Sequence, residues 1–173
     1  MYEDAEFPIE WHKQLAKYAK KIKIDFMSTP YDYDAVDLLD EIGVSAYKIG
    51  SGDITFLDFL KYISKKGKPI LLPTGASTIQ EIKKAILTIK STNNNKIIVL
   101  QSVTQYPSPI EEANILAMVS LRKKFRFNVG YSDHSPGTVI PIASVAHGAC
   151  VIEKHFTDDN NNEGPDHPHS LNP

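Results

Sequence analysis

The chain has 173 residues, of which 42% are hydrophobic, and its 19 basic and 21 acidic residues give a formal net charge of −2. This length suits one domain with a sizeable core, and the near balance of charge gives no support to nucleic-acid binding. No apolar run approaches the roughly 20 residues that cross a bilayer, and the N-terminus MYEDAEFPIE is acidic, so we expect a cytoplasmic protein outside the membrane.

The chain opens on a helical pattern. Residues 9–22 carry apolar side chains at helical spacing, which predicts an amphipathic helix. Residues 24–30 (IDFMSTP) then predict a strand ended by a proline, and residues 34–42 predict a second helix closed by Gly43. The apolar stripe of the first helix consists of Trp11, Leu15, Tyr18 and Ile22.

Strands and helices continue to alternate in the middle of the chain. Strands are predicted over residues 44–49, 69–72 and 96–101, mostly as continuous apolar runs. Thr78 and Glu81 have the spacing of a capping box, which indicates where the helix after the strand at 69–72 begins. The other two helices are predicted to end near residue 66 and to span about residues 111–124.

Two strands near the C-terminus are each followed by a histidine. Residues 128–131 precede His134, residues 150–152 precede His155, and an apolar segment between them has the length of a crossover helix. If the strands pair in parallel, about 4.8 Å apart, both histidines lie at the same edge of the sheet and can share a divalent ion. The alternative is that each histidine hydrogen-bonds a carboxylate or a backbone carbonyl. Cys150, the only cysteine, is expected to pack in the core.

Roughly six strands alternating with helices predict an α/β fold with a parallel sheet. Two architectures fit, an open doubly wound sheet and a (β/α)8 barrel. Polar residues follow nearly every strand, and a barrel gathers all strand ends around one mouth, which favours the barrel. These residues are Ser28, Thr29, Lys48, Ser51, Thr74, Ser102, Thr104, Tyr106, Asp133, His134 and His155.

Known nucleotide and calcium motifs do not fit the sequence. GSGDIT lacks the third glycine of the dinucleotide fingerprint, and no Gly-Lys-Ser/Thr phosphate loop occurs. The acidic segment 158–163 has Glu163 where an EF-hand requires glycine, so we interpret it as a surface loop.

Seven segments together resemble the sialic acid synthase family. They are FMSTPYD, AYKIGSGD, GKPILLPTGAS, QYPSP, GYSDH, IEKHFT and EGPDHPHS, and the likeness runs from about Trp11 to Pro173. The resemblance implies a partial (β/α)8 barrel and a transferase that condenses phosphoenolpyruvate with an N-acetylmannosamine-type sugar. The product is N-acetylneuraminate or a related nonulosonic acid, and phosphate is released.

The resemblance also implies roles for individual residues. His134 and His155 would hold a divalent ion, Mn²⁺ or Mg²⁺, and Lys48 would act with them in catalysis. The phosphate and carboxylate of phosphoenolpyruvate need cationic and hydroxyl donors without a competing carboxylate. The matching phosphoenolpyruvate contacts are Thr29, Lys48, Ser51 and Ser132, and the matching sugar contacts are Tyr106 and Asp166.

The chain also departs from the family pattern. Pro73, Asp53 and Thr104 replace a serine, a glutamate and an asparagine that are common there, which leaves the sugar open. The family's first two strands and its C-terminal antifreeze-like domain have no counterpart, so we expect residues 1–173 to be one incomplete barrel domain. It should be inactive alone, and the full-length protein should be a homodimer. The alternatives are a synthase for legionaminate or a spore-coat polysaccharide sugar, or a non-catalytic sugar-binding remnant.

Overall fold

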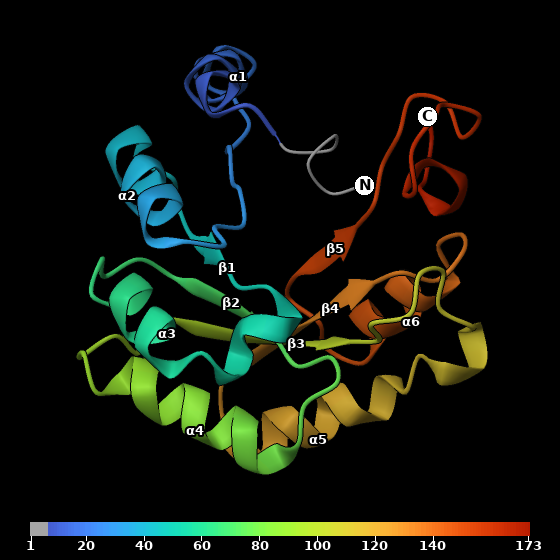
Figure 1. Cartoon of the computed structure of the whole chain (residues 1–173). Coiled ribbons are helices and arrows are strands. Elements are labelled where there is room, and N and C mark those ends of the chain that lie inside the picture. The colour runs from blue at the N-terminus through green and yellow to red at the C-terminus, as the bar shows by residue number, and fades with distance from the viewer. Residues whose placement is uncertain (1–6) are drawn as a thin grey trace.

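The computed structural model describes residues 7–173, and its centre is one parallel sheet. Five strands lie in the order β1-β2-β3-β4-β5, so each strand pairs with the next one along the chain. The sheet curls into an open half-barrel, and helices α2 to α6 follow one another in an arc around its outside (Figure 1). This arrangement confirms the predicted α/β class and the partial barrel.

Among residues 7–173, no helix combines the length and the apolar character needed to cross a membrane.

Most elements occur where the sequence predicts them. The strands are β1 (Tyr47–Lys48), β2 (Ile70–Pro73), β3 (Ile97–Ser102), β4 (Asn128–Asp133) and β5 (Ile152–Lys154). The α-helices are α1 (Ile9–Lys21), α2 (Tyr33–Ile42), α3 (Leu57–Ser64), α4 (Ile79–Lys90), α5 (Ile115–Phe125) and α6 (Val139–Ala146). The described residues also form the short 3-10 helices η2 (Ser51–Thr55), η3 (Ile110–Glu112) and η4 (His167–His169).

Alternation along the strands divides the side chains between the two faces of the sheet. Successive residues of a strand point to opposite faces, and paired residues of neighbouring strands share a face. The convex face packs against the helices and forms the core, which leaves polar residues on the concave face. Core residues of the convex face include Tyr47, Ile70, Leu72, Val99, Val129 and Tyr131, each at most 1% exposed.

The predicted signals at the helix ends are confirmed. The Thr78 hydroxyl accepts a hydrogen bond from the Glu81 N–H at 3.3 Å, and Glu81 accepts one from the Thr78 N–H at 2.7 Å, which completes the capping box. Gly43 ends α2 with a left-handed backbone, φ +82°, which glycine adopts without strain. Both signals are local, so they survive in the tertiary structure.

The strand predicted over residues 24–30 is wrong, and the sheet has five strands instead of about six. A strand needs a partner for its backbone, and among the described residues this segment has no ladder with β1. The Ile24 N–H instead donates to the Ala19 carbonyl at 3.0 Å, and the Asp25 carboxylate accepts from the Ser45 hydroxyl at 2.9 Å. β1 is therefore the edge strand on this side of the sheet.

The predicted helix at the start of the chain is confirmed as α1, whereas the predicted core position of Cys150 is wrong. The stripe of α1 faces away from the core, with Trp11 53% and Tyr18 58% exposed, and Ala19 is the buried residue of this helix. α1 contacts mainly α2, where Lys13 pairs with Glu41 at 2.8 Å, and no described element covers its apolar stripe. Cys150 is exposed because it lies just before β5, the other edge strand.

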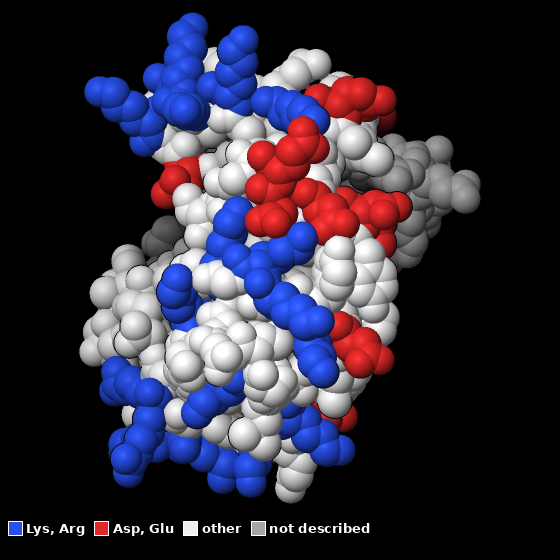
Figure 2. Space-filling model, turned by 90° about the vertical axis from the view of Figure 1, so that its left-hand side faces the viewer, with Lys and Arg blue, Asp and Glu red and all other residues white. Residues whose placement is uncertain are grey.

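The face over α1 and α2 carries charges in separate zones. Figure 2 shows basic side chains at the top of this face, an acidic band across its middle and further basic side chains below. The acids of α2 lie between the lysines of α1 and those that follow α3, and they form ion pairs with both groups. The basic residues therefore do not form one continuous surface here. The acids of α2 are Asp34, Asp37, Asp40 and Glu41.

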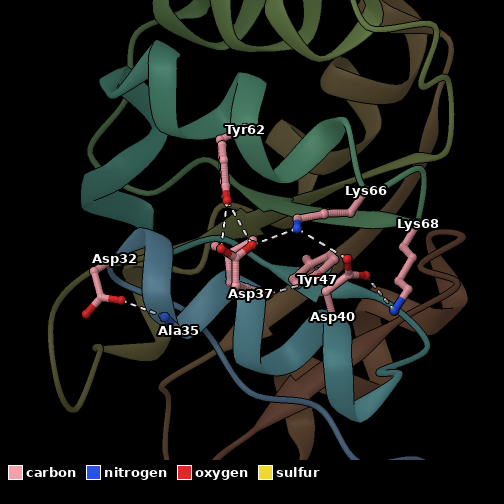
Figure 3. Close-up of polar contacts among 9 residues, drawn as sticks. Asp32, Ala35, Asp37, Asp40, Tyr47, Tyr62, Lys66 and Lys68 are labelled. Carbon is pink, nitrogen blue, oxygen red and sulfur yellow. Dashed lines mark hydrogen bonds and ion pairs between the residues drawn. The ribbon is translucent and has the colours of Figure 1, made fainter.

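A network of charged and tyrosine side chains joins α2 to α3 and to the segment between α3 and β2 (Figure 3). The Asp37 carboxylate accepts hydrogen bonds from the Tyr62 hydroxyl at 2.8 Å and from Lys66 Nζ at 2.7 Å. Asp40 pairs with Lys66 at 3.2 Å and with Lys68 at 3.3 Å. The hydrogen bonds from Lys66 and then from Tyr62 lower the pKa of Asp37. Its ionised form is therefore favoured in the folded state.

We expect the Asp37 network to make stability depend on pH. Because the folded pKa of Asp37 is lowered, its contribution is present above the unfolded pKa and is lost as pH falls through the folded value. Asp37→Asn should lower the melting temperature near neutral pH, and the difference from wild type should shrink between about pH 5 and about pH 3. Thermal unfolding followed by circular dichroism measures this difference.

The matched control is Glu163→Gln, which removes an exposed acid for which the described chain offers no hydrogen bond or ion pair. Its difference from wild type should stay small at every pH. A pH-independent difference for Asp37→Asn would show that the network acts through packing alone.

Candidate functional site

The carboxyl ends of the five strands meet at one edge of the half-barrel, and polar residues gather there. The register aligns Ser102 of β3 with Ser132 of β4, and Ser132 with Glu153 of β5. These three residues therefore form a row on the concave face. Ser102 and Ser132 are buried, at 6% and 2% exposure. A row of polar groups on a face free of helices is a candidate binding surface.

An ion pair between Lys48 and Glu153 spans this concave face. Lys48 Nζ lies 3.2 Å from Glu153 Oε1, although the two residues belong to the two edge strands β1 and β5. In a flat sheet these strands would be about 19 Å apart, four spacings of about 4.8 Å. The contact is therefore possible only because the sheet is strongly curled. The Lys48 side chain is 20% exposed, so it is held inside the curl and does not extend into solvent.

His134 follows β4, and one of its two ring nitrogens is free to bind a ligand. Its Nδ1 lies 2.5 Å from the carbonyl oxygen of Val103, so Nδ1 carries the proton and donates it. Nε2 then has the free lone pair, which is the usual arrangement of a metal-binding imidazole. Burial lowers the pKa of His134, which keeps the ring neutral.

The structure brings His155 and Tyr106 beside His134, as the sequence predicts. The His134 and His155 rings have centroids 5.4 Å apart, and the Tyr106 ring lies 3.9 Å from His134 and 5.6 Å from His155. His155 Nδ1 is 3.4 Å from Asp166 Oδ2. Burial lowers the pKa of His155, and the negative charge of Asp166 opposes part of this effect. Both rings can therefore offer a lone pair at neutral pH.

The other residues that the sequence predicts near the substrate show fewer contacts with this group of side chains. The Ser51 hydroxyl lies near the turn after β2, because a Cβ added to Gly75 would be 3.2 Å from Ser51 Oγ and 2.5 Å from Thr104 Cγ2. Asp53 sits beside Gly50, and burial raises the pKa of its carboxyl. For Thr29, the described structure gives no hydrogen bond to the other predicted residues.

Comparison with known proteins identifies the family. The model of the NeuB family matches residues 1–173. The chain belongs to the NeuB family. It is 47% identical over 175 residues to the N,N'-diacetyllegionaminic acid synthase of Campylobacter jejuni, a match that covers 100% of this chain and 52% of the relative. The chain spans about half the length of the curated relatives it matches.

Solved structures of the NeuB family share this fold. The N-acetylneuraminic acid synthetase of Leptospira borgpetersenii matches with a TM-score of 0.94 and 36% identity, over 98% of this chain and 59% of that one. The spore coat polysaccharide biosynthesis protein SpsE of Bacillus subtilis matches with a TM-score of 0.93 and 37% identity, over 96% of this chain and 47% of that one. The predicted resemblance to sialic acid synthases is confirmed at the level of the family, whose named members are sugar-acid synthases.

Sequence reasoning missed Glu153 in this NeuB chain. The EKHF motif contains it, but only the strand register shows that Glu153 faces Lys48 on the concave side. The expectation that Lys48 has no competing carboxylate is therefore wrong. Glu153 Oε2 and Ser102 Oγ are buried and have no hydrogen-bond partner among the described residues. Buried polar atoms without partners indicate a place where a ligand or water completes the hydrogen bonding.

A groove beside the strand ends is lined by Thr74 and Ser102, but it includes none of the residues predicted to bind substrate or metal. It has a volume of about 750 Å³ and opens between the N-terminal ends of α4 and α5. Its walls include the aliphatic residues Ile79, Ile82, Leu116 and Leu121, and Lys124 is the only titratable residue among them. The predicted substrate and metal contacts therefore lie outside this groove, although Ser102 belongs both to its wall and to the row on the concave face.

A buried ion pair supports the strand ends from the convex face. Lys154 Nζ lies 2.6 Å from Asp133 Oδ2, and the two side chains are 10% and 0% exposed. Lys154 also donates to the Ser135 carbonyl, and Asp133 accepts from the Ser135 hydroxyl at 2.7 Å. Asp133 and Lys154 are the direct neighbours of His134 and His155 in the chain, so this pair holds the two histidine segments together.

We expect Lys154→Met to be strongly destabilising. It leaves the Asp133 carboxylate buried without its cation, which typically costs about 3–5 kcal/mol. Urea unfolding should show this loss, whereas Lys83→Met, at an exposed position on α4, should change the free energy of unfolding by less than about 0.5 kcal/mol. Adding Asp133→Asn to Lys154→Met should recover part of the stability. Equal stability of Lys154→Met and Lys83→Met would contradict the structural role of the pair.

Proposed function

We propose that this chain carries the phosphoenolpyruvate- and metal-binding part of a cytoplasmic nonulosonic acid synthase. The enzyme would condense phosphoenolpyruvate with an N-acetylmannosamine-type sugar to give N-acetylneuraminate or a related acid. The observation that carries this proposal is the convergence of Lys48, Ser132, His134, His155 and Glu153 on one concave surface. Membership of a family of sugar-acid synthases supports it.

The reaction balances without a redox partner. The π electrons of the C2–C3 bond of phosphoenolpyruvate form a new C–C bond to the aldehyde carbon of the open-chain sugar, and the aldehyde oxygen takes up a proton. Water adds its oxygen at C2, and the C–O bond to the phosphate group then breaks. The products are a 2-keto sugar acid and inorganic phosphate.

Lys48 is suited to bind the anionic end of phosphoenolpyruvate. Its ammonium group is held on the concave face by Glu153, which orients it but also neutralises part of its charge. An incoming phosphate or carboxylate competes with Glu153 for this cation. Ser132, the next residue of the same row, offers a hydroxyl group, and Thr29 and Ser51 remain the further contacts implied by the family resemblance.

His134 and His155 are the proposed metal ligands. Both rings have a lowered pKa, and the hydrogen bond from His134 Nδ1 to the Val103 carbonyl leaves His134 Nε2 free to bind. These features fit a divalent ion such as Mn²⁺ or Mg²⁺. When bound, the ion would act as a Lewis acid that polarises the sugar aldehyde.

Tyr106 and Asp166 are placed to contact the sugar. The Tyr106 side chain packs on His134 and is still half exposed, so its outer edge is free for a ligand. Asp166 is 59% exposed and lies next to His155. An aromatic edge and a carboxylate together suit a polyhydroxylated ligand. The free Oε2 of Glu153 can accept a hydrogen bond from a sugar hydroxyl or from water.

The choice of sugar stays open between the members of the family. The relatives are named for N,N'-diacetyllegionaminic acid, for N-acetylneuraminic acid and for spore coat polysaccharide. A full-length homodimer belongs to the same proposal. The alternative is a sugar-binding remnant without catalysis, which would use the same concave surface.

An assay of phosphate release separates these two functions. We expect the 173-residue chain to bind phosphoenolpyruvate but to release little phosphate with Mn²⁺ and N-acetylmannosamine or its 2,4-diacetamido analogue. The same chain fused to the N-terminal barrel strands of the Campylobacter relative should release phosphate. Sugar binding by both proteins, without phosphate release by either, would support the remnant instead.

Lys48→Ala should weaken phosphoenolpyruvate binding by one charge-assisted contact, about 1.5–3 kcal/mol. Isothermal titration calorimetry measures this loss, and Lys83→Ala serves as the control at an exposed position. Glu153→Gln should bind phosphoenolpyruvate at least as tightly as wild type, because it removes the competing carboxylate. Unchanged affinity of Lys48→Ala would exclude Lys48 from the binding site.

A further inference from the structure

His169 lies beside His155, one of the two predicted metal ligands, although the sequence signals did not include it. It ends the short helix η4, in a segment that returns to the strand ends after β5. The Leu171 N–H donates to the His155 carbonyl at 2.9 Å, and the Thr157 N–H donates to the Leu171 carbonyl at 2.7 Å. These hydrogen bonds place the end of the segment directly against His155.

The returning segment is held in place by its own hydrogen bonds. Asn160 Nδ2 donates to the carbonyls of His167 at 2.7 Å and Ser170 at 2.9 Å, and the Ser170 hydroxyl donates to the Asp166 carbonyl at 2.7 Å. The carbonyl groups on both sides of His169 are therefore fixed. The position of the His169 ring is therefore set by a loop that its own hydrogen bonds hold in place.

The His169 side chain is buried but has an unpartnered nitrogen. It is 6% exposed, and its Nε2 has no hydrogen bond among the described residues. The nearest acid atom, Asp166 Oδ1, is 4.0 Å away, which is beyond hydrogen-bond distance. The ring lies 5.1 Å from the His155 ring and 5.9 Å from the Tyr106 ring, measured between centroids. A buried polar atom in this state indicates a partner that the described residues do not supply.

We propose that His169 is an additional ligand of the divalent ion, together with His155 and Asp166. One ligand atom from each of these three residues lies within 4.8 Å of the other two. Two ligands bound at about 2.1 Å to a common ion are at most about 4.2 Å apart, so small side-chain rotations bring all three to one ion. The inference rests on the proposed function, because that proposal supplies the ion at His155.

The added imidazole changes which metal the site prefers. The cluster offers two imidazole nitrogens and one carboxylate, and the proposed function adds the imidazole of His134, whereas Mg²⁺ prefers oxygen ligands and water. Nitrogen-rich sites bind Co²⁺ and Zn²⁺ more tightly than Mn²⁺, in the Irving–Williams order. The site should therefore select a transition-metal ion and should discriminate strongly against Mg²⁺.

Metal titration of the full 173-residue chain tests the inference. We expect Co²⁺ to bind with a visible absorption band that Zn²⁺ displaces and that Mg²⁺ in large excess does not. His169→Ala should lower the affinity for Co²⁺ by at least about 10-fold. His169→Phe keeps an aromatic ring beside His155 and Tyr106, and it should show the same loss. This second variant distinguishes the loss of a ligand from misfolding of the alanine variant. His147→Ala, at the exposed end of α6, should bind like wild type.

A second measurement counts the ligands directly. Pulsed electron paramagnetic resonance of bound Mn²⁺ should detect one fewer coordinated imidazole nitrogen in His169→Phe than in wild type. Wild-type affinity and nitrogen count in both His169 variants would overturn the inference. If His134→Ala and His155→Ala lose the metal in that case, the proposed metal site stands. If the wild-type chain binds none of the metals tested, both proposals fall.

Discussion

The ion pair between Lys48 and Glu153 depends on the curl of the sheet, and the rest of the site depends on the same curl. The two residues come from opposite edge strands and nevertheless approach to 3.2 Å. A flat sheet would hold their strands about 19 Å apart. Curling places the carboxyl ends of all five strands around one concave surface. The charges of this surface then act on one another at short range, in surroundings that water enters only partly.

Side chains alternate between the two faces of the sheet, so one face forms the core and the other can meet a ligand. The residues that point outward bury apolar side chains against α2 to α6, and this core provides the stability of the half-barrel. On the same outward face, the pair of Asp133 and Lys154 joins β4 to β5 directly beside the two histidines. The inward residues Ser132 and Glu153 are therefore free to meet a ligand, because they are not needed for packing.

Several buried polar atoms on the concave side have no protein partner. Glu153 Oε2, Ser102 Oγ and His169 Nε2 belong to three different segments, β5, β3 and η4, among the described residues. Leaving such atoms unpaired costs free energy, about 1–3 kcal/mol for each buried group. The substrate and the metal ion of the proposed function would recover this cost by supplying the missing partners. The stability of this region and its capacity to bind are therefore linked.

The sequence by itself determined the elements, the α/β class and the family motifs. Helical spacing, the capping box of Thr78 and Glu81, and Gly43 at the end of α2 are local signals, so they hold whatever the rest of the chain does. The prediction that His134 and His155 meet was also correct in geometry, because one crossover between parallel strands almost always leads back to the same edge.

Only the tertiary structure decided which segments find partners. Residues 24–30 have the pattern of a strand but lack a neighbour to pair with, and the apolar stripe of α1 lacks a described element that would bury it. Glu153 meets Lys48 through the curl of the whole sheet, and His169 reaches His155 through a returning loop. These contacts join residues from different segments of the chain, and no local periodicity in the sequence predicts such contacts.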